Sequence, residues 1–238
     1  AVVVSTIPDD RAVEAVAAEL LPRLGGERLW VEMSTVSPAA WERVRAAAGP
    51  AAGRLVAAPV SGSTVAAASA QLFVMVSGAA AAVEAVLPLL RLFGPKVLVV
   101  GPGGEARYLK LVINHAVGTT AHLLAEALAL GRRGGLDWRV MLDAIGESAV
   151  ASPLVRYKLA PLRERDFAPA FTTRQMVKDM SLVAEACAAT GVPAPLAGLV
   201  LERYRAQEAA GLGEADFFAA VRLVEREAGL GGLEPGEP

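Results

Sequence analysis

Short runs of aliphatic and β-branched residues alternate with helical patterns over the first hundred residues, and this alternation narrows the possible folds more than any other feature. Strands that are buried on both faces appear as continuous apolar runs, which are typical of a parallel sheet covered by helices. We expect strands at 2–5, 29–33, 55–57, 72–76 and 97–100, and helices between them at 11–24, 38–48 and 79–93. The first half of the chain is therefore predicted to be a largely parallel α/β domain.

The pattern changes after Gly101-Pro102-Gly103-Gly104. From about residue 105 to residue 226 the apolar residues follow helical spacing, and no stretch favours a strand. The expected helices are 105–132, 137–145, 153–163, 173–190, 195–210 and 214–227. We therefore predict a sheet domain over 1–103, an all-helical domain over 104–230 and a disordered tail over 231–238.

Charge and cysteine content exclude several classes of protein. The 23 Lys and Arg against 25 Asp and Glu leave no basic excess, so a nucleic-acid partner is not expected. The single cysteine, Cys187, excludes an internal disulfide and a cysteine-rich metal site. His115 and His122 lie seven residues apart without an acidic or cysteine partner in the same helix, so no metal site is expected.

Residues 55–83 carry no charged side chain, which raises the possibility of a membrane span. Pro59, Ser61-Gly62-Ser63 and Gln71 divide this stretch into short pieces with turn signals, so a buried α/β core fits better. The chain opens on Ala1-Val2-Val3-Val4 without a secretory leader pattern, and we expect a cytoplasmic protein with no membrane partner.

Lys110 is isolated in an otherwise uncharged helical stretch, because no Asp, Glu, Lys or Arg occurs from Leu111 to Ala125. Asn114 lies one turn further on the same face, and a lysine and an amide at this spacing can hold one carbonyl or hydroxyl oxygen together. That face continues with the small residues Gly118, Ala121 and Ala125. The simpler alternative is a lysine that extends its ammonium group to solvent.

Three further segments are candidates for binding. Ser61-Gly62-Ser63 follows an expected strand, where backbone N–H groups can bind a carboxylate, although an ordinary turn fits as well. Ser34-Thr35 also follows a strand, with helix capping as the alternative. Lys178-Asp179 lies inside an expected helix, where a solvated charge pair is the simpler interpretation.

These segments occur in one order that resembles the β-hydroxyacid dehydrogenase family over nearly the full length of the chain. Ile7-Pro8 resembles the cofactor loop of that family, and Gly104, Lys110 and Asn114 fit its Gly-x5-Lys-x3-Asn catalytic helix. Residues 34–38 match the Ser-Thr segment of the family, and residues 58–62 match its Ala-Pro-Val-Ser-Gly substrate loop. Phe171 together with residues 178–180 matches its Phe…Lys-Asp stretch.

The resemblance implies an NAD- or NADP-dependent oxidoreductase that interconverts a small β-hydroxy acid and its semialdehyde. It implies that Lys110 is the general acid or base, that Asn114 orients the substrate hydroxyl, and that Ser61, Gly62 and Ser63 bind the substrate carboxylate. The residues expected to line the cofactor are Ile7, Pro8, Ala12, Thr35 and Lys178. A homodimer or homotetramer is expected, formed through the helical domain.

The sequence also departs from the family pattern. Ala57 and Ser63 replace the usual Asp and the second Gly of the substrate loop, and Ile113 replaces a first Asn. No G-x-G-x-x-G occurs, so the expected fold is an incomplete Rossmann-like sheet domain that exposes a strand edge and binds NAD(P) poorly. The alternative function is a cofactor-incomplete, non-catalytic protein that dimerises or binds a partner. Imine reductases are disfavoured by Lys110, and phosphogluconate-type enzymes by the short helical half.

Overall fold

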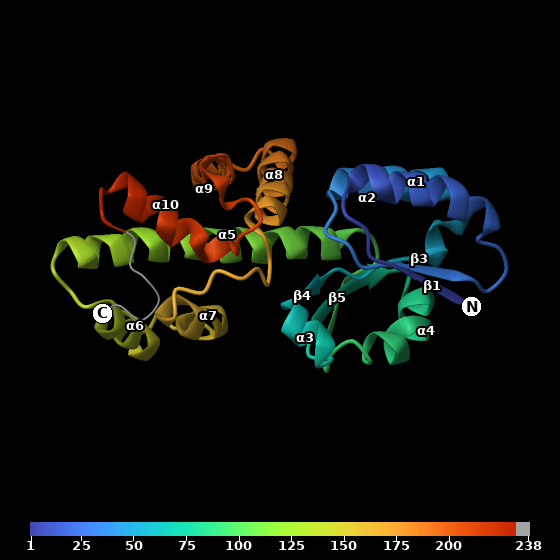
Figure 1. Cartoon of the computed structure of the whole chain (residues 1–238). Coiled ribbons are helices and arrows are strands. Elements are labelled where there is room, and N and C mark those ends of the chain that lie inside the picture. The colour runs from blue at the N-terminus through green and yellow to red at the C-terminus, as the bar shows by residue number, and fades with distance from the viewer. Residues whose placement is uncertain (232–238) are drawn as a thin grey trace. The chain divides into compact units, whose positions relative to one another are not determined.

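A computed structural model describes residues 1–231 and divides the chain into two compact units (Figure 1). Unit 1 comprises Ala1–Ile113 and Glu185–Val192. Unit 2 comprises Asn114–Ala184 and the described residues from Pro193 onward. The division falls within two helices, Glu105–Arg133 and Thr173–Thr190, so the first turns of the former and the last turns of the latter belong with the sheet. The predicted tail lies outside the described residues, apart from Gly231.

Unit 1 contains a six-stranded sheet in the order β1-β2-β3-β5-β4, with β6 also paired to β5. The strands are β1 (Val2–Ser5), β2 (Leu29–Glu32), β3 (Leu55–Ala57), β4 (Val60–Ser61), β5 (Phe73–Gly78) and β6 (Lys96–Gly101). Strands β1, β2 and β3 run parallel to one another, and so do β5 and β6. The two groups meet antiparallel at the β3–β5 pair. β1 lies at the sheet edge, and its three valines are exposed.

The prediction of a largely parallel sheet is therefore wrong for the joint between β3 and β5, although every predicted strand is present. A parallel return needs a crossover, usually a helix that spans the sheet. The connection here holds only α3 (Thr64–Ala68), which is too short for that purpose. Instead β4 pairs antiparallel with β5, so the chain turns back directly. Both α3 and β4 lie where the sequence predicted only a loop.

The register aligns one residue from each of five strands in a single row. Ser5 pairs with Glu32, Glu32 with Ala57, Ala57 with Ser77, and Ser77 with Gly101. This row marks the carboxyl ends of β1, β2 and β3. The β4–β5 pair extends beyond it, because Ser61 lies opposite Phe73, four residues before Ser77. At the usual rise per residue the pair extends about 13 Å past the row.

Helices cover both faces of the sheet, as the sequence predicted (Figure 1). On one face, α1 (Asp10–Leu20) and α2 (Pro38–Ala48) pack over a core that contains Trp30 and Trp41, whose ring centroids are 6.0 Å apart. On the other face, α4 (Ala80–Leu90) packs over the opposite side chains of the same strands. A capping side chain begins each of α1 and α2, because Asp9 accepts from Ala12 N and Ser37 accepts from Ala40 N.

The remaining helices are α5 (Glu105–Arg133), α6 (Trp138–Glu147), α7 (Pro153–Arg163), α8 (Thr173–Thr190), α9 (Pro195–Gln207) and α10 (Ala220–Glu227). The long helix α5 ends before Gly135, whose φ of 80° suits glycine. The prediction of a last helix from residue 214 is wrong at its start. Asp216 instead caps a short 3-10 turn by accepting from Phe218 N, and it also accepts two hydrogen bonds from the buried Lys158 ammonium group.

Candidate active site

Two loops of unit 1 that the sequence assigned to the cofactor lie at the carboxyl ends of β1 and β2. The Ile7 backbone N–H donates to Ser34 Oγ over 2.6 Å, which joins the Ile7-Pro8 loop to the Ser34-Thr35 loop. In open α/β sheets, ligands bind outside the carboxyl ends of the strands. The pair of loops therefore fits the nicotinamide end of a dinucleotide.

Ser37, rather than Ser34 or Thr35, caps helix α2. The Ser37 backbone N–H also donates to Asp10, which holds the starts of α1 and α2 together. Ala12 is a weaker cofactor candidate than the sequence indicated, because its N–H already donates to Asp9 over 2.8 Å. Thr35 is half-buried beside Ser34, and its contact with the cofactor stays a prediction.

A buried ion pair that sequence reasoning missed lies directly behind Ser34. Arg107 on α5 donates from Nη2 to Glu32 Oε2 over 2.6 Å, and both side chains are fully buried. Its Nη1 donates to the Ser34 carbonyl over 2.7 Å, and its guanidinium carbon lies 4.4 Å from the centre of the Trp41 ring. Burial lowers the pKa of the Arg107 guanidinium, and the adjacent Glu32 carboxylate opposes that shift. The available signal was Glu32, a charge inside an apolar strand.

The predicted substrate loop, Ser61-Gly62-Ser63, lies on the extension formed by β4 and β5. Gly62 has a φ of 143°, and a Cβ atom there would lie 2.7 Å from Leu72 Cδ2. The loop therefore requires glycine at this position. Ser63 caps α3 by accepting from Ala66 N, while Ser61 takes part in the β4–β5 pair. Binding of a carboxylate by this loop stays a prediction.

Lys110 lies on α5, three residues after Arg107, and it is half-buried in unit 1. One further helical turn leads to Asn114, which belongs to unit 2 and is buried. Their positions on one continuous helix confirm the spacing on which the catalytic prediction depends. The roles of Lys110 and Asn114 stay predictions.

Asn114 is fixed by a second residue that sequence reasoning did not select. Its Nδ2 donates to Asp179 Oδ2 over 2.6 Å, and Asp179 is buried on α8. Lys178 Nζ lies 2.8 Å from Asp179 Oδ1. Since a carboxylate accepts only, the Asn114 amide nitrogen must face Asp179, which leaves the amide oxygen for another donor. Lys178 is half-buried and Asp179 is buried, so the two do not form a fully solvated charge pair.

The small-residue face of α5 permits the close packing that the sequence predicted. The Tyr204 hydroxyl donates to the Gly118 carbonyl over 2.7 Å. A Cβ atom on Gly118 would lie 2.9 Å from Met180 Sδ and 3.2 Å from Met176 Sδ. Glycine at this position lets α8 and α9 approach the α5 backbone within unit 2.

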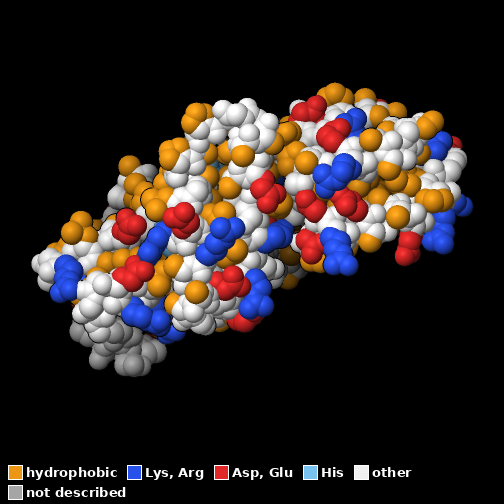
Figure 2. Space-filling model, turned by 90° about the horizontal axis from the view of Figure 1, so that it is seen from above, with side chains coloured by type: hydrophobic (Ala, Val, Ile, Leu, Met, Phe, Trp, Pro, Cys, Tyr) orange, Lys and Arg blue, Asp and Glu red, His pale blue; other side chains and the backbone are white. Residues whose placement is uncertain are grey.

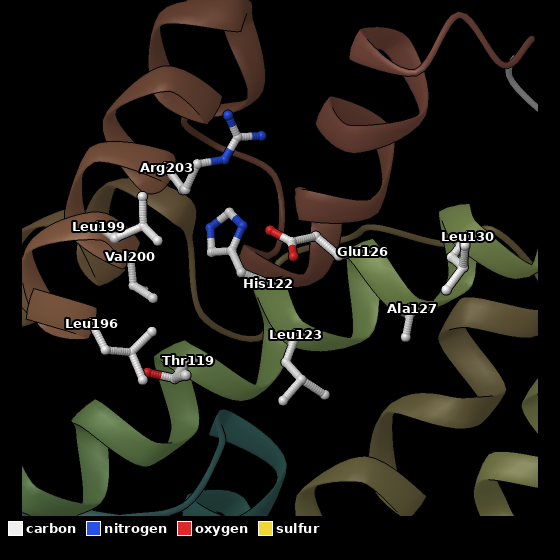
Figure 3. A pocket seen from close by; sticks show the side chains of 10 residues that line it. All are labelled: Thr119, His122, Leu123, Glu126, Ala127, Leu130, Leu196, Leu199, Val200 and Arg203. Carbon is white, nitrogen blue, oxygen red and sulfur yellow. The ribbon is translucent and has the colours of Figure 1, made fainter.

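A hollow lies elsewhere, between α5 and α9 in unit 2. It encloses about 570 Å³ and contains none of the predicted catalytic or cofactor residues. Figure 3 shows His122 at its centre, between Arg203 of α9 and Glu126 of α5. The surrounding apolar side chains include the exposed residues Leu123, Leu130, Leu196 and Leu199. We call this hollow the α5–α9 groove.

His122 is almost fully buried in this groove, and neither ring nitrogen has a hydrogen-bond partner among the described residues. Its ring lies 4.3 Å from the ring of Tyr204, centroid to centroid. Burial and the positive charge of Arg203 lower the pKa of His122 to about 4, although Glu227 acts in the opposite direction.

Comparison with known proteins assigns both halves of the chain. A family model described as the NAD-binding domain of NADP-dependent 3-hydroxyisobutyrate dehydrogenase matches residues 104–224. A second, described as the NAD-binding domain of 6-phosphogluconate dehydrogenase, matches residues 1–101. An NAD-dependent L-serine dehydrogenase of Pseudomonas aeruginosa is 30% identical over 94% of this chain and 78% of that enzyme. The chain belongs to the β-hydroxyacid dehydrogenase family.

Other relatives and solved structures agree with this assignment. A 2-(hydroxymethyl)glutarate dehydrogenase of Eubacterium barkeri is 32% identical to the present chain. The match covers 84% of the present chain and 67% of the Eubacterium enzyme. The structure of Mycobacterium tuberculosis 3-hydroxyisobutyrate dehydrogenase with L-serine superposes with a TM-score of 0.84 at 28% identity, covering 94% of this chain and 79% of that one. Imine reductases, at 19% identity and TM-scores of 0.51 to 0.57, share the fold alone.

These findings confirm the predicted fold class, the NAD(P) cofactor and the hydroxyacid dehydrogenase activity class. The non-catalytic alternative is not favoured. In residues 1–231 of this dehydrogenase, no cluster of potential metal ligands occurs, and no helix has the length and apolarity of a membrane span. Figure 2 shows acidic and basic side chains interspersed over the face in view.

The buried His122 predicts a specific pH dependence of stability. Folding lowers the pKa of His122 from the ordinary 6.5 to about 4, so above pH 6.5 the side chain is neutral in both states and the free energy of unfolding is not reduced. As the pH falls from 6.5 toward 4, only the unfolded state binds the proton, and the free energy of unfolding drops by up to about 3 kcal/mol. We expect His122→Phe to lose less unfolding free energy between pH 7 and pH 4.5 than the wild type, as measured by urea denaturation.

The matched control is Leu123→Ala, one residue further on the same helix and in the same groove, which removes no titratable group and should keep the wild-type pH dependence. Equal pH dependence in the wild type and in His122→Phe would contradict the prediction.

Proposed function

We propose that this dehydrogenase interconverts a small β-hydroxy acid and its semialdehyde, with Lys110 as the proton donor and acceptor. The observation that carries the proposal is the position of Lys110 on α5. It lies one turn beyond Arg107, whose hydrogen bonds reach the Ser34 loop at the expected nicotinamide end of the site. The named activities of the relatives, on L-serine, 2-(hydroxymethyl)glutarate and succinic semialdehyde, support this substrate class.

The nicotinamide supplies or accepts the hydride at C4 when it is bound. In the reductive direction the Lys110 ammonium group gives its proton to the substrate carbonyl oxygen, which becomes the hydroxyl group. In the oxidative direction neutral Lys110 takes that proton back. Asn114, with its amide nitrogen held by Asp179, presents its amide oxygen to the substrate hydroxyl and orients it.

The substrate carboxylate is assigned to the backbone N–H groups of Ser61, Gly62 and Ser63, on the extension beyond the carboxyl ends of β1, β2 and β3. We assign the cofactor to Ile7, Pro8, Ala12, Thr35 and Lys178, with Ala12 the weakest of the five because its N–H already donates to Asp9. In this scheme residues 1–103 supply the substrate-carboxylate loop and most of the cofactor contacts, and residues 104–230 supply Lys110, Asn114, Lys178 and the self-association surface. We propose a cytoplasmic location for the enzyme.

We further propose that the dehydrogenase is a homodimer or homotetramer in which a second copy occupies the α5–α9 groove. The exposed leucines of the groove are an apolar surface that a partner would bury. Glu126 and Arg203 line the same groove with opposite charges. A two-fold interface brings one surface against itself, so Glu126 of each copy can face Arg203 of the other, which is also ion-paired with Glu227 of its own copy.

Replacing Lys110 tests the chemistry. Lys110→Met should lower kcat at least about 100-fold, the usual effect of losing a positioned proton donor, and should change the Kd for the nucleotide little. Steady-state assays with L-serine, 3-hydroxyisobutyrate and succinic semialdehyde measure kcat, and calorimetry measures Kd. Lys96→Met, at an exposed position of β6, is the control. Retention of more than about a tenth of kcat in Lys110→Met would exclude the proton-transfer role.

Replacing Lys178 separates two roles. If the ammonium group binds the cofactor, Lys178→Met should raise the KM for the nucleotide by about tenfold, the effect of losing one charged hydrogen bond. The KM for the acid should then change less. If Lys178 acts only on Asp179 and Asn114, the acid KM and kcat should change and the nucleotide KM should not. That second pattern would remove Lys178 from the cofactor site.

The groove proposal is tested by mass in solution. Sedimentation equilibrium should give at least a dimer for the wild type and a smaller assembly for Leu199→Glu, which puts a charge into the apolar groove. Leu92→Glu, at an exposed leucine of unit 1, should keep the wild-type mass. A monomeric wild type, or an unchanged mass for Leu199→Glu, would overturn the proposal.

A further inference from the structure

We propose that Arg107 is a positioning residue that holds the catalytic helix against the cofactor loops. The inference rests on the proposed function, since it assumes that Lys110 transfers the proton. Arg107 itself contacts neither reacting group in this scheme. Its role is to fix where α5 lies relative to the carboxyl ends of β1 and β2, and so where Lys110 lies.

The contacts of Arg107 use the fork shape of its guanidinium group. One terminal nitrogen donates to the Ser34 carbonyl over 2.7 Å. The other donates to Glu32 Oε2 over 2.6 Å and to the Glu32 carbonyl over 3.2 Å. A planar, delocalised group can meet these acceptors and the Trp41 ring at once, whereas a lysine ammonium group is a single point charge.

The partners of Arg107 extend the arrangement to the second cofactor loop. Glu32 Oε1 accepts from Ser34 N over 2.9 Å, so the carboxylate binds the arginine and the loop together. Ser34 Oγ in turn accepts from Ile7 N over 2.6 Å. One continuous set of buried or half-buried hydrogen bonds thus runs from Ile7 through Ser34 to α5. Lys110 is the next residue on that side of the helix, three positions after Arg107.

The Glu32–Arg107 ion pair is better explained by its effect on the position of α5 than by a contribution to the stability of the fold. Taking both charges out of water costs much of what their attraction returns, and apolar pairs of similar volume often fold as stably. A hydrophobic pair, however, would leave the Ser34 carbonyl without its arginine donor and Ser34 N without its carboxylate acceptor. The directional bonds, rather than the burial, are what an apolar pair cannot replace.

The decisive variant is therefore the double substitution Glu32→Met with Arg107→Met, which removes one charge of each sign and leaves neither charge unpaired. We expect it to fold, to lose at least tenfold in kcat and to raise the nucleotide KM severalfold. Arg107→Lys keeps the charge but should not restore kcat, because it lacks the fork.

A readout without turnover uses reductive ¹³C-methylation of the lysines and NMR of the cofactor-free protein. The chain has four lysines, and only the Lys110 signal should shift in the double variant and in Arg107→Lys. Lys96, Lys158 and Lys178 are internal controls. An unchanged Lys110 signal, with wild-type kcat and nucleotide KM, would overturn the positioning role.

Lys110→Met, measured in parallel, distinguishes the two possible failures. If Lys110→Met is active, the proposed proton transfer fails, and the NMR shift alone decides whether Arg107 positions the helix. If Lys110→Met is inactive while the Arg107 variants match the wild type in every readout, only the positioning inference fails.

Discussion

The buried ion pair between Glu32 and Arg107 is the interaction on which the arrangement of unit 1 depends. A charge with no access to water must have a partner of opposite sign, so neither residue can be buried without the other. The two residues are 75 positions apart in the chain. Their contact therefore fixes a strand that forms early in the sequence against a helix that follows the whole sheet.

Helix α5, which carries Arg107, also carries a row of small residues in unit 2, where α8 and α9 pack against it. Gly118 leaves the α5 backbone accessible to Tyr204 and to the methionines of α8, and Ala121 and Ala125 further along are also buried. The same helix thus meets two different requirements along its length. Its first turns need specific polar partners in the sheet, and its middle needs the absence of side-chain volume.

Local signals predicted much of the fold. Proline at the first position began α2 and α7 where expected, and Gly134-Gly135 marked the end of α5 to within a residue. Wherever the outcome depended on residues distant in the chain, sequence reasoning failed. The direction of β5 depends on how it pairs with β3, and the start of α10 depends on Asp216 binding Lys158.

The candidate site follows the same division. Lys110 and Asn114 stand out because their spacing is local, and the resemblance to a known family added the loops in order. Arg107 and Asp179 were missed because each is defined by a partner on another element, Glu32 in one case and Asn114 in the other. An ionisable residue inside an apolar strand, such as Glu32, is the one signal that pointed to such a partner.

The extension formed by β4 and β5 separates two properties of the sheet that usually change together. Each residue of β5 between the row of Ser77 and the loop at Ser61 adds about 3.3 Å, and side chains alternate faces with a period of two. Inserting or deleting two residues there moves the loop by about 7 Å, and all the remaining side chains of the strand stay on the same face of the sheet. The depth of the space beyond the strand ends is therefore set by strand length, independently of the composition of the core beneath it.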